Sequence, residues 1–407
     1  MTVRRVPGDS DADLRSADPV RLELEGLSMT DLPARTSDED SGNRSSSKRE
    51  KLYAASQWTL MRIKFKDHKL AMIGLVLLAV FYGLALFAPF VAPYGPWRNS
   101  EALYAPPTRI HLAHEGRLRR PFVYGIWMKV DPSTFDRSIE TDTSQIHPIR
   151  FFVKGSEYRW LGLLRTDRHL FGVDPSAGIH LLGTDMLGRD CFSRDLWALQ
   201  ISLTVGMFGV FLTFVLGCLI GGVSGYYGGI VDNLLQRFME VVTCIPTIPM
   251  WMALSAAIPI EWGNVKTYFA ITVILALRSW TGLSRQVRSK LLQLREEEFV
   301  VAAKVAGTSD WRIITTHLLP GFMSFLIVSL TLEIPKMILG ETALSFLSLG
   351  LRPPTVSLGV LLQDAQNLAA VSVYPWLMFP ALMVILSVLA FNFVGDGLRD
   401  AADPYKE

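Results

Sequence analysis

The sequence predicts an all-α integral membrane protein with six transmembrane helices and a small mixed extracytoplasmic domain between the first and the second. Half of its 407 residues are hydrophobic, and its mean hydropathy of +0.28 is typical of a membrane protein rather than a soluble one of this length. Six stretches approach the roughly 20 apolar residues that cross a bilayer. They are residues 70–91, 201–222, 234–258, 265–283, 322–344 and 374–394.

The region before the first apolar stretch has two parts. Residues 1–50 are polar and poor in large apolar side chains, so they bury too little surface to offset chain entropy and predict a disordered cytoplasmic tail. In residues 51–69, Trp58, Met61 and Phe65 recur at helical spacing among lysines and arginines. This pattern predicts an amphipathic interfacial helix that contacts membrane lipid. The net charge of only +2 gives no indication of nucleic-acid binding.

Charges in the short loops predict the orientation of the chain. The basic cluster before residues 70–91 places the N-terminus in the cytoplasm, and six spans return the C-terminal residues 395–407 to the same side. The loop of residues 284–321 carries six basic residues and is therefore also expected inside. Residues 92–200 contain many arginines too, but long loops cross the membrane largely regardless of charge.

Residues 92–200 form the predicted extracytoplasmic domain. Stretches such as PIRFFVKG and YRWLGLL have strand-like composition and are punctuated by Pro and Gly. The segment ends in HLLGTDMLGRDCFSRDLWALQISL, where His180, Asp185 and Asp190 resemble a catalytic cluster. A capped turn that leads into a helix is the favoured interpretation, because Asp is a common turn and N-cap residue.

Motifs for enzymatic chemistry are absent from the sequence. It contains no G-x-x-x-x-G-K-[ST], no G-x-S-x-G, no H-E-x-x-H and no C-x-x-C. His111 and His114 are spaced to share a metal, although solvated loop residues are the simpler interpretation. We therefore expect no catalytic residue, no metal site and no cofactor bound by this chain, which is not expected to be an enzyme.

The second apolar stretch carries a row of small residues. Gly217, Gly221 and Gly225 recur at i, i+4 spacing and lie on one face of a helix. Such a face lets another helix approach closely, which favours association inside lipid. The partner is either another helix of this chain or a second membrane subunit.

Several ionisable residues fall within or beside the apolar stretches, where each costs about 2.5–3.5 kcal/mol on insertion scales. Glu333 and Lys336, at i, i+3, are positioned to pair with each other. Two interpretations stay open for the set: neutralisation and placement at helix ends, or a polar path through the membrane. The candidate residues are Glu240, Arg278, Glu333, Lys336 and Glu341.

The polar stretch REEEFVVAAKVAGTSDWRIITTHLLP, residues 295–320, predicts a helical hairpin. Glutamates 296–298 suit a first helical turn, and Gly307 suits the left-handed position after the last. Ser309 is the expected N-cap of a second helix from Asp310 to about Leu318, which Pro320 closes off. The hairpin has a small face, which either docks in a groove of another protein or packs on this chain's own helix ends. That face consists of Ala302, Ala303, Ala306 and Gly307.

This stretch resembles the EAA loop of ABC-importer permeases. More narrowly, it is similar to the C-type permease subunit of the dipeptide/oligopeptide/nickel class, and three further segments agree in order: residues 180–203, 338–367 and 374–404. The similarity covers about residues 57–404, apart from parts of the extracytoplasmic domain. Val301 and His317 depart from the general loop pattern.

The resemblance implies the six-helix ABC-importer permease fold in the bacterial inner membrane. The implied partners are a homologous B-type permease subunit, two ABC ATPase subunits that bind ATP and Mg, and an extracytoplasmic substrate-binding protein. The expected cargo is short peptides, with nickel, an oligosaccharide or an opine-like solute as alternatives, and a stand-alone channel as the rival function. The implied ATPase-coupling residues are Glu298, Ala302, Ala303, Gly307, Asp310, Leu319 and Pro320. The ionisable residues inside the spans would line or brace the path.

Overall fold

A computed structural model describes residues 57–114, 117–130, 137–160, 162–174 and 177–402. All described elements belong to the unit Gln57–Glu407. The predicted tail of residues 1–50, and the start of the predicted interfacial helix, lie outside the described residues.

The first described helices are α2 (Gln57–Asp67), α3 (Lys69–Leu86) and α4 (Ala88–Val91). His68 separates α2 from α3 and caps α3, because its Nδ1 accepts a hydrogen bond of 3.1 Å from the amide of Ala71. The span predicted for residues 70–91 is present in α3 but ends at Leu86, since the chain leaves helical geometry at Phe87. Pro89 lies in the first turn of α4, where a missing N–H is tolerated.

Five strands follow in two antiparallel sheets. The first sheet has the order β1 (His111–His114), β2 (Arg117–Val130) and β3 (Arg137–Pro148), and the second pairs β4 (Arg150–Trp160) with β5 (Leu164–Gly172). Strands are thus present in both stretches that the sequence singles out. The expected mixed domain is all β over the described residues 92–190, because helix α5 begins only at Cys191, where Asp190 accepts from the Ser193 amide at 2.8 Å.

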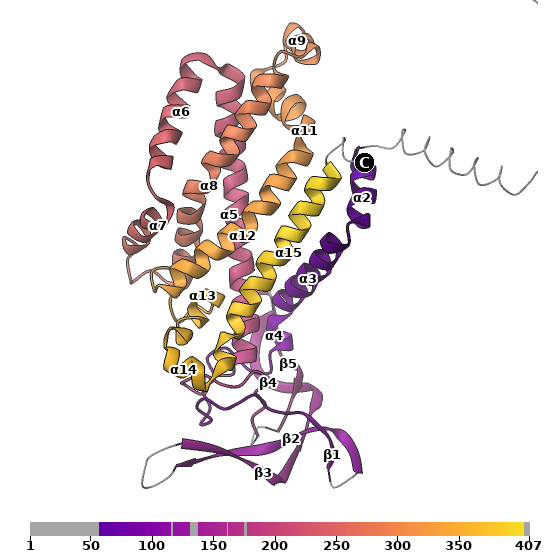
Figure 1. The fold of residues 1–407 in the computed structure, drawn as a ribbon, viewed down its shortest axis with the longest axis vertical. Coiled ribbons are helices and arrows are strands. Elements are labelled where there is room, and N and C mark those ends of the chain that lie inside the picture. The colour runs from indigo at the N-terminus through magenta and orange to yellow at the C-terminus, as the bar shows by residue number, and fades with distance from the viewer. Residues whose placement is uncertain (1–56, 115–116, 131–136, 161, 175–176, 403–407) are drawn as a thin grey trace, which may run out of the picture. The chain divides into compact units, whose positions relative to one another are not determined.

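The next helices are α5 (Cys191–Tyr227), α6 (Gly229–Cys244), α7 (Thr247–Ala256) and α8 (Asn264–Leu294). The stretch of residues 234–258, predicted as one span, is divided between α6 and α7, which are bent by 83° to each other. Ile245 and Pro246 between them are extended, as expected where a proline restricts the preceding residue. Figure 1 shows α6 and α7 beside α8.

The remaining elements run from the polar hairpin to the C-terminal helix. The hairpin comprises α9 (Glu298–Val305), α10 (Asp310–Arg312), the π-helix η1 (Ile313–Leu318) and α11 (Leu319–Gly321). After α12 (Met323–Phe346) come α13 (Leu358–Leu361), η2 (Asp364–Gln366), α14 (Leu368–Val373), η3 (Pro375–Met378) and α15 (Phe379–Ala402).

Within the described residues, four helical segments are long and apolar enough to cross a membrane: 69–86, 191–227, 323–346 and 375–402. The bent pair α6 and α7 makes a fifth if it is one span. The predicted span at residues 265–283 lies in α8, a helix of 31 residues that includes Lys266, Arg278 and Arg285. The chain is therefore a multi-pass membrane protein, with four or five spans by length and composition among the described residues, and the predicted count of six is not confirmed.

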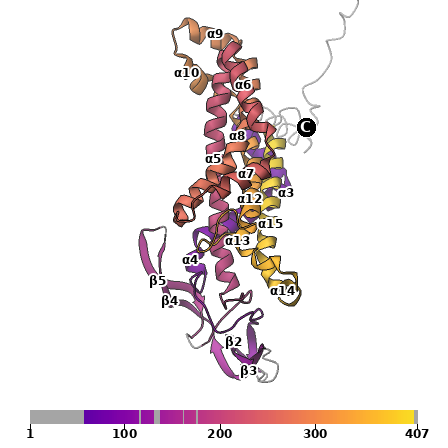
Figure 2. The same ribbon diagram turned by 90° about the vertical axis from the view of Figure 1, so that its left-hand side faces the viewer.

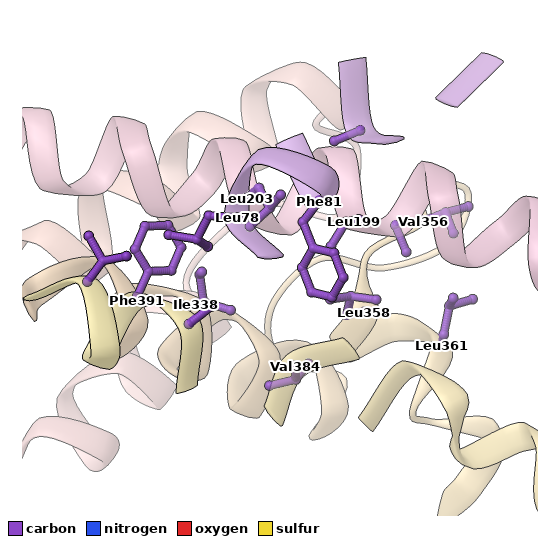
Figure 3. Close-up of a cluster of buried hydrophobic side chains, with 14 residues drawn as sticks. Leu78, Phe81, Leu199, Leu203, Ile338, Val356, Leu358, Leu361, Val384 and Phe391 are labelled. Carbon is purple, nitrogen blue, oxygen red and sulfur yellow. The ribbon is translucent and has the colours of Figure 1, made fainter. Parts of the chain in front are cut away.

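The helices pack around a shared apolar cluster. Residues from α3, α5, α12, α13 and α15 meet there, and α8 runs along α5. Figure 3 shows Phe81 of α3, Leu199 of α5 and Leu358 of α13 pointing toward one another, with Val384 of α15 beside them. Helix association in lipid depends on such van der Waals contact, because the surroundings are as apolar as the core.

Candidate functional site

The hairpin of residues 298–321 lies at one end of α5 and α8, with α9 outermost (Figures 1 and 2). Gly307 has a φ of +76°, as predicted for the residue after a helix end. The Gly307 amide donates to Lys304 O and the Thr308 amide to Ala303 O, both at 3.0 Å, which together form a Schellman motif. A Cβ at Gly307 would meet no atom within 4 Å, so the backbone conformation, and not lack of space, requires glycine.

The two ends of the hairpin differ from the prediction. Only Glu298 lies in the first turn of α9, because Glu297 is the N-cap and is extended. Ser309 is the N-cap of the second helical segment, although its side chain makes no capping bond. Pro320 does not close this segment, which continues to Gly321 through π-type turns. Pro320 is tolerated there because it lies in the first turn of α11, where its missing N–H costs least.

The inner side of the hairpin is anchored in an apolar cluster. Val300, Ile313 and Leu318 are fully buried against Leu291 of α8 and Leu326 of α12. Ala303 and Leu319 are partly buried against the same cluster. The predicted small face is therefore divided, since Ala303 turns inward.

The outer side of the hairpin is exposed. Ala302, Ala306, Gly307 and Asp310 are exposed, and large apolar residues surround them: Val305 is 85% and Trp311 54% exposed, and Phe299 and Val301 are exposed as well. Four large apolar side chains exposed within residues 299–311 suit a protein-docking site. The structure thus combines the two interpretations of the hairpin, with one side packed on the chain and the other open.

A polar contact joins the hairpin to the end of α5. The Tyr226 hydroxyl donates to Asp310 Oδ1 at 2.6 Å, and Lys304 Nζ lies 4.9 Å above the Tyr226 ring. Asp310 is one of the residues named from the sequence, whereas Tyr226 is not. No local pattern identifies Tyr226, because its partner is 84 residues away in the chain.

A second polar contact lies near this end of the helices. Arg288 of α8 donates two hydrogen bonds of 2.5 Å to Asp232 of α6, and Ser224 of α5 donates to the same carboxylate at 2.6 Å. The hydrogen bonds to Asp232 raise the pKa of Arg288 above its usual range, so the guanidinium stays charged. The cluster fixes α5, α6 and α8 to one another next to the hairpin.

The candidate path residues occupy three different environments. Glu240 is half-exposed and pairs with Arg237 at 2.7 Å. Glu333 and Lys336 form the predicted pair, with their charged atoms 2.6 Å apart, and Arg278 donates to Thr281 Oγ1 at 3.1 Å. Each of these side chains has its partner on its own helix, within four residues. The structure therefore does not bring these candidates into one cluster.

Glu341 is fully buried and is held by three hydroxyl groups. Its Oε1 accepts from Ser345 and Ser357, both at 2.7 Å, and its Oε2 accepts from Ser202 at 2.9 Å. The Ser202 hydroxyl also accepts from the Leu358 amide at 3.1 Å. The carboxylate therefore joins α12 to α5 and to the segment that begins α13.

The row of glycines on α5 lies against α8. A Cβ at Gly217 would approach Leu283 to 2.8 Å, and one at Gly225 would approach Arg288 O to the same distance. At Gly221 it would collide with Ser284 O and lie 2.9 Å from Val287 Cβ. In this structure the small face is occupied by a helix of the same chain.

The cluster at the start of α5 has the structural roles predicted for it. Asp190 caps α5, and its other carboxylate oxygen contacts His180 Nδ1 at 3.1 Å. Asp185 accepts from the amides of Leu187 and Arg189 and forms ion pairs with Arg189 and Arg194. Across the described ranges, no group of three His, Cys, Asp or Glu residues is arranged to hold a metal ion.

Comparison with known proteins gives two family matches. Residues 214–406 match the family described as binding-protein-dependent transport system inner membrane component. Residues 56–107 match the N-terminal transmembrane domain of oligopeptide transport permease C.

Individual relatives cover most of the chain. The oligopeptide transport system permease protein OppC of Haemophilus influenzae is 39% identical over 59% of this chain and 75% of its own length. The dipeptide transport system permease protein DppC of Lactococcus lactis subsp. cremoris is 30% identical over 84% of this chain and 88% of its own. A chain of the inward-facing MetNI methionine ABC transporter covers 50% of this chain and 94% of its own, at 17% identity and a TM-score of 0.40. Because of these sequence matches, this chain belongs to the family of binding-protein-dependent transport system inner membrane components.

Proposed function

We propose that this chain is the C-type permease subunit of an ATP-binding-cassette importer that moves short peptides across the bacterial inner membrane. Relatives named as oligopeptide and as dipeptide permeases both match it, which supports short peptides as the cargo class. The match to the N-terminal domain of permease C supports the C-type assignment.

The proposed machine divides its work among several subunits. This chain has no P-loop, so ATP and Mg would be bound by two partner ATPase subunits, and the chain itself would not be an enzyme. A B-type permease subunit would complete the membrane path, and an extracytoplasmic binding protein would deliver the peptide. Both termini and the hairpin would lie in the cytoplasm, with the sheets of residues 111–172 on the other side.

The hairpin is the observation that carries this proposal. Its exposed outer side offers α9 and apolar side chains to a groove, which is a common mode of helix recognition. Its buried inner side packs Val300 and Ile313 against α8 and α12, and Asp310 is bonded to Tyr226 of α5. A displacement of the hairpin by an ATPase would therefore be transmitted to three helices through packed contacts.

The proposal is tested by making the exposed side of α9 bulky without disturbing its buried side. Ala302→Trp and Ala306→Trp, in the complex reconstituted in lipid with its partners, are expected to lower peptide-stimulated ATP hydrolysis about tenfold or more, since a clash at a packed interface costs about 1–3 kcal/mol. Leu118→Trp is the control, because Leu118 is exposed on β2 in the β1–β2–β3 sheet.

Two measurements decide the outcome: assembly of the ATPase subunits with the permease, and stimulation of ATP hydrolysis by peptide. The ATPase subunits should co-purify less with the two α9 variants and normally with the control. Unchanged assembly and unchanged stimulated hydrolysis in both α9 variants would rule out the hairpin as the docking element.

A further inference from the structure

The β4–β5 hairpin is tied to the end of the first membrane-spanning helix. The indole N–H of Trp160, the last residue of β4, donates to the carbonyl of Leu86, the last residue of α3, at 3.0 Å. The Trp160 ring stacks on Phe87 with centroids 5.5 Å apart and planes 14° from parallel. Since α3 is apolar enough to cross the bilayer, these contacts place the end of β4 at the level where the span meets the membrane surface.

The turn of this hairpin exposes large apolar side chains. Leu163 is 83% and Leu164 61% exposed. Figure 2 shows the hairpin projecting to one side of the helices, with β4 and β5 beside α4. Two exposed leucines next to a tryptophan at a span end are unfavourable in water and favourable in the headgroup region of a bilayer.

The same hairpin is basic. Residues 150–172 contain five lysines and arginines against two acidic residues. Arg159 and Arg165 are exposed, and no carboxylate among the described residues lies within ion-pair distance of either. Arg168 is exposed as well, and among the described contacts its guanidinium donates only a long bond of 3.4 Å to the carbonyl of Phe152. These guanidinium groups are available to an anion from outside the chain.

An open groove of about 520 Å³ lies between the hairpin and the residues that follow α3. Phe87 and Phe90 form one wall, and Trp160 and Leu164 belong to the hairpin wall, together with Arg165 and Arg168. An apolar groove with two arginines matches a phospholipid, whose acyl chain is apolar and whose phosphate accepts bidentate hydrogen bonds from guanidinium.

We propose that the β4–β5 hairpin is a membrane anchor that inserts its turn into the bilayer surface and binds the phosphate of an anionic phospholipid through Arg165 and Arg168. The groove is continuous with the end of a membrane span, so lipid is its immediate neighbour, and the positive charge complements an anionic headgroup. The anchor holds the β4–β5 sheet at a fixed height on the membrane. It is a property additional to peptide import and does not depend on the cargo.

Lipid retention tests the charged part of the proposal. The complex is reconstituted in nanodiscs of equal phosphatidylcholine and phosphatidylglycerol, and the lipid that remains bound after detergent exchange is measured by mass spectrometry. The variant Arg165→Gln with Arg168→Gln is expected to retain phosphatidylglycerol less, by about fivefold for each charge removed. The matched control is Arg119→Gln with Arg120→Gln, two exposed arginines on β2, which should retain as much as the unmodified chain. Equal retention in the hairpin variant and the control would overturn the lipid site.

Insertion of the turn is tested separately, with a spin label at Leu163→Cys. The background is Cys244→Ser, because Cys191 and Cys218 are buried and Cys244 is the exposed cysteine. In the same nanodiscs the label should collide more with oxygen than with a water-soluble nickel complex, and a label at Leu118→Cys should do the opposite. A label at residue 163 that is fully accessible to the nickel complex would contradict insertion. If the label at residue 163 is shielded from the nickel complex only after the binding protein is added, the turn is a protein-docking surface, and the membrane anchor is overturned.

Discussion

Glu341 shows how a buried carboxylate inside a membrane protein can serve structure. The sequence leaves two roles open for it, a polar path or a neutralised group. The structure surrounds it with three hydroxyl donors from Ser202, Ser345 and Ser357, which belong to α5, α12 and the segment before α13. Removing the acceptor would leave these buried donors unsatisfied, which costs more than the bonds themselves contribute.

Glu341→Ala is therefore expected to lower the free energy of unfolding by about 2 kcal/mol. Glu341→Gln should cost less, because its amide oxygen still accepts from two of the serines. Denaturant unfolding of the purified chain in detergent measures both. Glu333→Gln, which removes a pair with the exposed Lys336, is the control and should change stability by about 0.5 kcal/mol or less. A loss for Glu341→Ala no larger than the control's would exclude the structural role.

The hydrogen bond between Tyr226 and Asp310 allows a test of whether motion of the hairpin is transmitted to α5. Tyr226→Phe keeps the ring beneath Lys304 and removes only the hydroxyl that bonds Asp310. Because Asp310 is exposed, the bond is worth about 1 kcal/mol. Peptide transported per ATP hydrolysed should fall about fivefold, with assembly of the complex unchanged. An unaltered ratio would show that this contact is not on the coupling route.

At the level of elements, local chemistry determines what the sequence predicts well. The turn at Gly307 and the cap at Asp190 each depend on one residue and its immediate neighbours, and both are present as predicted. The angle between α6 and α7 and the break at Phe87 do not follow from the sequence, because apolar composition alone does not distinguish a straight span from a bent one. The contacts of Tyr226 with Asp310 and of Asp232 with Arg288 join residues 84 and 56 positions apart, which no pattern in one sequence reveals.

The close approach of α5 and α8 depends on Gly221. Gly221→Ala is expected to cost about 2 kcal/mol of unfolding free energy, because the added Cβ would collide with Ser284 O and force the two helices apart. Gly282→Ala on α8 is the matched control, since its Cβ would meet no atom within 4 Å and alanine favours a helix by about 1 kcal/mol. Thermal unfolding in detergent compares the two. If Gly221→Ala is as stable as Gly282→Ala, the glycine row does not set this helix contact.

At the level of the whole molecule, the hairpin and the sheets form distinct surfaces joined by the helices (Figure 1). The hairpin has an anchored side and an open apolar side, which suits a protein partner. The β4–β5 hairpin combines leucines, tryptophan and arginines beside a span end, which suits the bilayer surface. Family membership follows from motif order and the multi-pass membrane character from long apolar stretches, so the sequence predicts both, although not the number of spans. The sheet pairing and the groove at Trp160 depend on contacts that are distant in sequence.

Site-specific cross-linking from the hairpin tests the central claim most directly. A photoreactive probe attached at Ala302→Cys, on the Cys244→Ser background, is activated in cells that contain the whole importer, and the same probe at Leu118→Cys serves as the control. The account predicts a covalent product between residue 302 and an ATPase subunit, and none between residue 118 and an ATPase. A product with an ATPase from residue 118, or none from residue 302 in a fully assembled complex, would contradict it.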